Sequence, residues 1–135
     1  MSALQDILVA IRSDADIVVA RQQGRSLAAT LGFTATDATL IATAISELAR
    51  NIVSYAGQGE VMISGVETPH RKGILICARD SGPGIRSIDD VLRDGFSTSG
   101  GLGLGLPGVR RLMDEFNIES ELERGTTVTV KKWLK

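Results

Sequence analysis

The sequence predicts an α+β fold: a two-layer α/β sandwich in which helices cover one face of a mixed, mostly antiparallel sheet. Two observations lead to this class. Segments with helical periodicity cluster early in the chain, and the β-like runs that follow form pairs joined by polar turns. At 135 residues, with 43% hydrophobic and 23% charged residues, the chain has the size and composition of one globular domain, which we expect to span residues 1–135.

The first half of the chain predicts one strand and two helices. Ile7–Ile11 is a short β-branched apolar run that is typical of a strand. Over Ala15–Leu31 the apolar residues recur at helical spacing, and Gly32 is the expected cap. Thr34 offers an N-cap to a second helix, Ala38–Tyr55, which has the strongest periodicity in the chain.

The second half predicts two hairpins and one further helix. Val61–Val66 and Gly73–Arg79 are β-like runs separated by a polar turn, which indicates a hairpin. A helical pattern follows over Leu106–Phe116, and the runs Phe116–Glu123 and Thr126–Trp133 predict a second hairpin. We therefore expect strands to dominate this half of the fold.

Single residues and charge exclude several classes of protein. Cys77 is the only cysteine and lies in an apolar run, so neither a disulfide framework nor a zinc site is possible, and we expect it in the core. We expect Trp133 to pack the last strand against the helices. The formal net charge is −1 with mixed signs along the chain, so neither nucleic acid nor a membrane is an expected partner. The start of the chain lacks a signal-peptide pattern, and we expect a cytoplasmic protein.

Two glycine-rich segments lie about twenty residues apart, Asp80–Gly84 and Gly100–Gly105, and the second leads directly into a helical pattern. Glycine permits positive φ and close approach of the backbone to a ligand. A helix N-terminus presents unpaired N–H groups and the positive end of a dipole. This layout favours a phosphate-binding site.

Two common nucleotide motifs do not fit. A P-loop requires Gly-Lys-Ser/Thr, which the sequence lacks. Gly103–Gly108 matches Gly-x-Gly-x-x-Gly, and Glu123 follows twenty residues later. However, this match follows a polar loop instead of a buried strand, and only about thirty residues remain for the rest of a dinucleotide fold.

Four polar residues are candidates for a site, although each also has a purely structural interpretation. Glu47 and Asn51 are spaced i, i+4, so they share one face of the second helix. A carboxylate can act as a base and an amide oxygen can bind Mg²⁺, but a solvated pair is the simpler interpretation. Asp80 follows an apolar run and can form an Asx turn. Thr126 can be an ordinary strand residue.

The order of these motifs along the chain resembles the GHKL (Bergerat-fold) ATP-binding superfamily, which includes gyrase, the MutL proteins, heat-shock chaperones and histidine kinases. Within it, the chain is similar to the small serine kinases of bacterial partner-switching systems, both the anti-sigma factor kinases and the RsbT-type switch kinases of the stressosome. The stretches that carry this likeness are residues 46–51, 79–85, 100–109 and 125–128.

The resemblance implies a role for each candidate residue. It implies ATP and Mg²⁺ as cofactors, Glu47 as general base and Asn51 as the Mg²⁺ ligand. Asp80 would bind the adenine amine with help from Thr126, and residues 85–100 would form a lid. The remaining cofactor-binding residues would be Gly82 and Gly84 beside the base, and Gly101, Leu102, Gly103, Leu104 and Gly105 at the phosphates.

The function that follows is an ATP- and Mg²⁺-dependent protein serine/threonine kinase that phosphorylates a STAS-domain antagonist in a bacterial stress-signalling module. A phosphatase or another downstream regulator that it activates or sequesters would be a further partner. The short lid favours the switch kinases over direct capture of a sigma factor. Because Gly100–Gly105 contains no basic residue, Arg50 and Arg93 are candidates for a basic contact with the phosphates.

Two other functions stay open. A nucleotide-sensing binding protein that sequesters a regulator, as an anti-sigma factor does, would need the same pocket, although it would not need Glu47 as a base. The catalytic domain of a histidine kinase is the second alternative. It is disfavoured because His70 lies in a polar turn with no dimerising helix pair around it.

Overall fold

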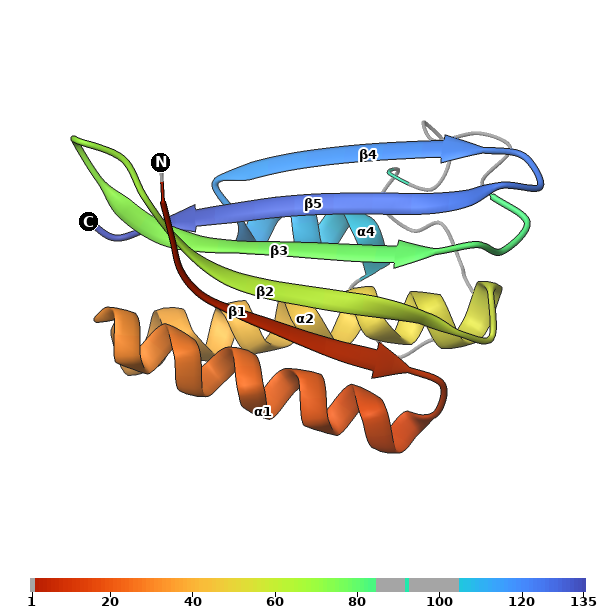
Figure 1. Cartoon of the computed structure of the whole chain (residues 1–135), viewed down its shortest axis with the longest axis horizontal. Helices are drawn as coiled ribbons and strands as arrows, with labels where there is room; N and C mark the ends of the chain where they lie inside the picture. Colours follow the sequence, from red (N-terminus) through yellow and green to blue (C-terminus); the bar gives the residue numbers. More distant parts are fainter. Residues whose placement is uncertain (1, 85–91, 93–104) are drawn as a thin grey trace.

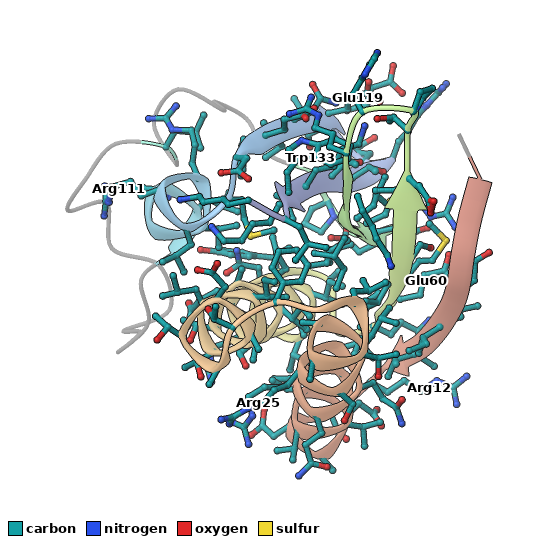
Figure 2. The ribbon with its side chains drawn as sticks, turned by 90° about the vertical axis from the view of Figure 1, so that its left-hand side faces the viewer. Arg12, Arg25, Glu60, Arg111, Glu119 and Trp133 are labelled. Carbon is teal, nitrogen blue, oxygen red and sulfur yellow. The ribbon has the colours of Figure 1, made fainter. Side chains whose placement is uncertain are left out.

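A computed structural model describes residues 2–84, 92 and 105–135 of the chain. Five strands form one sheet in the order β1-β2-β3-β5-β4, and each of their pairings is antiparallel. The helices α1, α2 and α4 lie on one side of this sheet (Figures 1 and 2). The predicted α+β sandwich is confirmed. The elements are β1 (Ser2–Ile11), α1 (Asp14–Leu31), α2 (Ala35–Tyr55), β2 (Gly59–Glu67), β3 (Lys72–Asp80), α4 (Gly105–Leu112), β4 (Glu115–Glu121) and β5 (Gly125–Trp133).

The two long helices begin and end where local chemistry requires. Gly32 ends α1 with φ of +105°, and its N–H group bonds to carbonyl groups of the last turn. Thr34 Oγ1 accepts the N–H of Asp37 at 3.1 Å, so α2 begins at Ala35, three residues before the predicted start. No helix among the described residues is both long enough and apolar enough to cross a bilayer.

The core lies between the sheet and the helices. Because side chains alternate along a strand, every second residue of the inner strands faces α1 and α2. Gly24 allows α1 to approach α2, since a Cβ at this position would collide with Ile45. The fully buried large side chains include Ile41, Ile45 and Leu48 from α2 and Val61, Ile63, Ile74, Ile76 and Val130 from the strands.

The last helix is shorter than predicted. It ends at Leu112 instead of Phe116, and Glu115 already belongs to β4. Glu115 pairs with Lys131 of β5, and the carbonyl oxygen of Leu112 accepts a bond from Lys132 Nζ at 2.9 Å. Pairing with a neighbouring strand therefore overrides a helical periodicity that continues past residue 112.

Two residues lie on the face of the sheet away from the helices, although Cys77 was expected in the core and Trp133, which is buried, was expected against the helices. Lys132 points toward α4, so its neighbour Trp133 points away from the helices. There Trp133 Nε1 donates to Glu115 Oε2 at 2.5 Å, and the guanidinium of Arg71 lies 4.0 Å from the ring centroid. Cys77 is half-buried on the same outer face. The expectation for both residues was wrong because the apolar character of a run does not say which face each side chain occupies.

Candidate active site

The end of β3 positions the first group of predicted site residues. Asp80 is the last residue of β3, is half-buried, and stands opposite Thr126 of β5. Its Oδ1 atom accepts the N–H of Gly82 at 2.9 Å, which is the Asx turn that the sequence suggested. The spacing between Asp80 and Thr126 is thus set by backbone pairing. We call Asp80, Gly82, Gly84 and Thr126 the strand-end group.

The glycines of this group are explained by the packing of the chain itself. A Cβ on Gly82 would lie 2.6 Å from the Cβ of Ala56 at the end of α2. Gly84 has φ of +80°, and a Cβ there would collide with the carbonyl oxygen of Glu121. The end of α2, the turn after β3 and the end of β4 therefore converge beside Asp80. The expectation that Gly82 and Gly84 lie beside an adenine base stays a prediction.

Thr126 has a hydroxyl partner that the sequence did not reveal. Its Oγ1 lies 2.9 Å from Ser120 Oγ, which also donates to the carbonyl oxygen of Gly125 at 3.0 Å. Ser120 faces Thr126 because the two residues are paired in the register of β4 and β5. The predicted hairpin was the available signal, but the sequence alone does not fix that register.

Helices α2 and α4 position the second group. Glu47 lies in the middle of α2 and is only 7% exposed. Its Oε2 atom accepts the backbone N–H of Gly105, the first residue of α4, at 3.3 Å. Gly105 has φ of +66°, a conformation that glycine adopts readily. A carboxylate that is far away in sequence thus reaches the N–H groups at the start of a helix.

Asn51 lies one turn beyond Glu47 on α2 and is half-buried. The i, i+4 spacing puts the amide and the carboxylate on the same side of the helix. From Asn51 the helix continues to Tyr55, and a Cβ on Gly82 would collide with the cap residue Ala56, so the end of α2 lies beside the strand-end group. We call Glu47, Asn51 and Gly105 the helix group.

Arg50 contacts Glu47, because its Nη1 atom lies 3.0 Å from Glu47 Oε1. The sequence suggested Arg50 as a loose candidate for binding phosphate, and that role stays a prediction. The i, i+3 spacing of the two residues on one helix was the signal for this pair. Both oxygens of the Glu47 carboxylate are therefore engaged, one by Arg50 and one by Gly105.

Part of the predicted site lies outside the described residues. This part includes the predicted lid at residues 85–100 apart from Leu92, and with it Arg93. It also includes the predicted phosphate-binding residues Gly101, Leu102, Gly103 and Leu104. Within the described ranges, no three His, Cys, Asp or Glu side chains form a cluster that could hold a metal ion. The expectation that Asn51 binds Mg²⁺ together with phosphate and water oxygens stays a prediction.

A hollow of about 530 Å³ lies across the ends of β1, β2, β3 and β5. Figure 2 shows Arg12 and Glu60 from its lining far from Arg111 of α4. The hollow contains basic groups, but Arg79 pairs with Glu60 at 2.6 Å and Arg124 with Glu121 at 3.4 Å. Among the predicted site residues that the structure describes, only Asp80 lines it.

Known proteins resemble this chain along most of its length. A serine/threonine-protein kinase RsbT of Bacillus subtilis (strain 168) is 55% identical over 127 residues, which cover 94% of this chain and 96% of the relative. An anti-sigma F factor of Geobacillus thermodenitrificans is 35% identical over 84% of this chain and 81% of its own length. Another, from Anoxybacillus flavithermus, is 32% identical over 85% and 82%.

The family described as histidine kinase-, DNA gyrase B- and HSP90-like ATPases matches residues 36–135. Apart from Ala35, the first residue of α2, this range contains both groups of site residues and every described element after β1 and α1. The chain therefore belongs to the family of histidine kinase-, DNA gyrase B- and HSP90-like ATPases.

Proposed function

We propose that this protein is an ATP- and Mg²⁺-dependent protein serine/threonine kinase that phosphorylates a STAS-domain antagonist in a bacterial stress-signalling switch. One observation carries the proposal: the Glu47 carboxylate lies 3.3 Å from the Gly105 N–H at the start of α4. A helix N-terminus favours phosphate. The potential base is therefore next to the place where the terminal phosphate of ATP would lie.

Phosphoryl transfer requires few groups beyond a base and a set of N–H donors, which Glu47 and the start of α4 would supply. Phosphoryl transfer depends mainly on positioning and on neutralising charge. Glu47 accepts the proton of the attacking seryl hydroxyl, and the N–H groups of α4 stabilise the phosphate oxygens. Glu47 is nearly buried, so the protein and not bulk water determines which way its carboxylate points.

Asn51 would hold Mg²⁺ beside the phosphates. Its amide oxygen is a hard ligand of the kind that Mg²⁺ binds, and it lies one turn from Glu47 on the same side of α2. When bound, the metal ion neutralises the charge of the phosphate chain. The role of Asn51 is to fix the position of that charge relative to the base.

The strand-end group would bind the adenine base. Asp80 uses Oδ1 in the turn to Gly82, and its carboxylate has a second oxygen that can accept a hydrogen bond from the adenine amine. Thr126 lies opposite Asp80 on β5 and would help to hold the adenine base beside Asp80. Gly82 and Gly84 would form the wall of this pocket.

The relatives support the proposed class of protein substrate. The chain is a serine/threonine kinase by its relationship to RsbT, and the anti-sigma F factors are related along four fifths of the chain. Proteins of this kind act within partner-switching modules, which supports a STAS-domain protein as acceptor and a phosphatase or similar regulator as a second partner. Such a switch would operate in the cytoplasm, where ATP is available.

The direct test is transfer of radiolabelled phosphate. The protein is incubated with γ-labelled ATP, Mg²⁺ and a purified STAS-domain protein, and phosphoserine is identified in the acceptor. Label is expected on serine with the native chain and not with Glu47→Ala. Equal labelling by Glu47→Ala, or no labelling of any STAS-domain acceptor by the native chain, contradicts the proposal.

The anti-sigma F relatives support a second candidate, a nucleotide-sensing protein that sequesters a regulator without transferring phosphate. The two candidates predict opposite results in cells. If the kinase reaction is the function, Glu47→Ala abolishes regulation. If sequestration is the function, Glu47→Ala leaves regulation intact and Asp80→Asn, which impairs nucleotide binding, abolishes it.

A further inference from the structure

The Glu47 carboxylate is held by two contacts of different kinds. Oε1 lies 3.0 Å from Nη1 of Arg50, which belongs to the same helix. Oε2 accepts the N–H of Gly105 at 3.3 Å, and Gly105 belongs to α4. The first contact lies within one helix. The second competes with any anion that binds at the start of α4.

The ion pair between Glu47 and Arg50 is not an ordinary surface pair. The Glu47 side chain is 9% exposed and that of Arg50 is 46% exposed. The pair between Glu121 and Arg124 has the same i, i+3 spacing, but both side chains are exposed, at 68% and 79%. Exposed pairs contribute little, whereas a nearly buried carboxylate is costly to leave without a cation. Arg50 therefore has a strong effect on where the Glu47 carboxylate lies.

We propose that Arg50 is a positioning residue for phosphoryl transfer. It anchors Glu47 Oε1, so that Oε2 becomes free to accept the seryl proton when the phosphates of ATP occupy the Gly105 N–H. This inference rests on the proposed function, in which Glu47 is the base and Gly105 binds phosphate. Arg50 itself touches none of the reacting atoms.

The step balances without any further reactant. The seryl O–H bond breaks and its proton moves to Glu47 Oε2, while the seryl oxygen forms a bond to the γ-phosphorus. The bond from that phosphorus to the oxygen bridging to ADP breaks, and its electron pair leaves with ADP. Because Arg50 stays bound to Oε1 throughout, the carboxylate does not rotate away when Gly105 releases it.

A double-mutant cycle tests this role. The turnover number and the dissociation constant of ATP are measured for the native chain, Arg50→Gln, Glu47→Gln and the double variant. We expect Arg50→Gln to lower the turnover number about tenfold or more and to change ATP affinity by less than about twofold. In the Glu47→Gln background, Arg50→Gln should cause no further loss. Arg50→Lys, which keeps the charge, should restore most of the turnover.

Arg124→Gln is the matched control, since it removes an exposed arginine from an i, i+3 pair; we expect native turnover. Equal loss from Arg50→Gln in both backgrounds, or weaker ATP binding, would mean that Arg50 acts on the phosphates and would overturn the inference. Native turnover in Arg50→Gln overturns it as well. If Arg50→Gln does not fold, Arg50→Met keeps the aliphatic stem and carries the same expectation. Native activity of Glu47→Gln would instead overturn the proposed function, which keeps the two failures distinct.

Discussion

The strand-end group and the helix group are built in different ways. In the strand-end group, Asp80 and Thr126 are opposite residues of neighbouring strands, so backbone hydrogen bonds fix their distance. In the helix group, Glu47 reaches Gly105 through a single side-chain bond between residues 58 positions apart. The first arrangement is rigid, and the second can rearrange without unfolding an element.

This difference agrees with the proposed roles, in which the strand-end group binds the adenine base and the helix group carries out phosphoryl transfer. A pocket for a base must keep one shape, and the strand-end group has little room to change because a Cβ on Gly84 or Gly125 would strike backbone. A catalytic carboxylate must exchange partners during the reaction. The Glu47 carboxylate has one partner within its own helix and one that a ligand can replace. We therefore expect changes in the two groups to affect different measurements.

The largest effect should come from Glu47→Gln in the helix group. An amide of the same shape cannot accept the seryl proton, so the rate of serine labelling should fall by about 10²–10⁴. ATP affinity, measured by isothermal titration calorimetry, should stay close to the native value. A loss of ATP affinity as large as the loss of rate would show that both groups contribute to binding.

Gly125→Ala should cause the next largest effect, this time on stability. Gly125 has φ of +110°, and a Cβ would collide with the carbonyl oxygen of Asp80. Strain and collision together should cost about 3 kcal/mol or more in the free energy of unfolding, measured by urea denaturation. Gly57→Ala is the control, because Gly57 has φ of +81° with nothing within 4 Å, and should cost only about 1–2 kcal/mol. Similar losses at both positions would contradict the convergence of chain segments at Asp80.

Asp80→Asn should weaken ATP binding while leaving the fold intact. The amide can still accept the Gly82 N–H, but it loses the charge that would bind the adenine amine. The expected change in the free energy of binding is about 1.5–3 kcal/mol. Asp114→Asn is the control, because Asp114 also accepts a backbone N–H, that of Trp133 at 2.8 Å, away from the site. Native affinity in Asp80→Asn would remove the strand-end group from nucleotide binding.

The smallest effect should come from Thr126→Val. Valine keeps the shape but leaves Ser120 without its hydroxyl partner, which should cost about 1 kcal/mol in the free energy of unfolding. A small reduction in ATP affinity should accompany it. Thr129→Val on the outer face of β5, whose hydroxyl contacts Cys77 Sγ at 3.8 Å, should change neither. If both substitutions changed stability and ATP affinity equally, the effect would come from any loss of a hydroxyl on β5 and not from the contact between Thr126 and Ser120.

Much of the fold was predictable because its signals are local. Thr34 and Gly32 mark helix ends through chemistry that acts within a few residues, and both predictions are confirmed. The end of α4 was not predictable, because it depends on Glu115 pairing with Lys131 of another strand. The position of Trp133 was missed for a related reason: alternation along β5 is visible in the sequence, but the face that the helices cover is not.

In the candidate site, too, the local features were predictable from the sequence, whereas the contacts between distant segments were not. The sequence by itself determined the order of the motifs, the i, i+4 spacing of Glu47 and Asn51, and the glycines that permit tight turns, because each of these is a property of neighbouring residues. Only the tertiary structure decided that Glu47 meets Gly105, that Arg50 pairs with Glu47, and that Ser120 faces Thr126. Those contacts depend on how helices pack and on strand register, which are set by the whole core and not by any single segment.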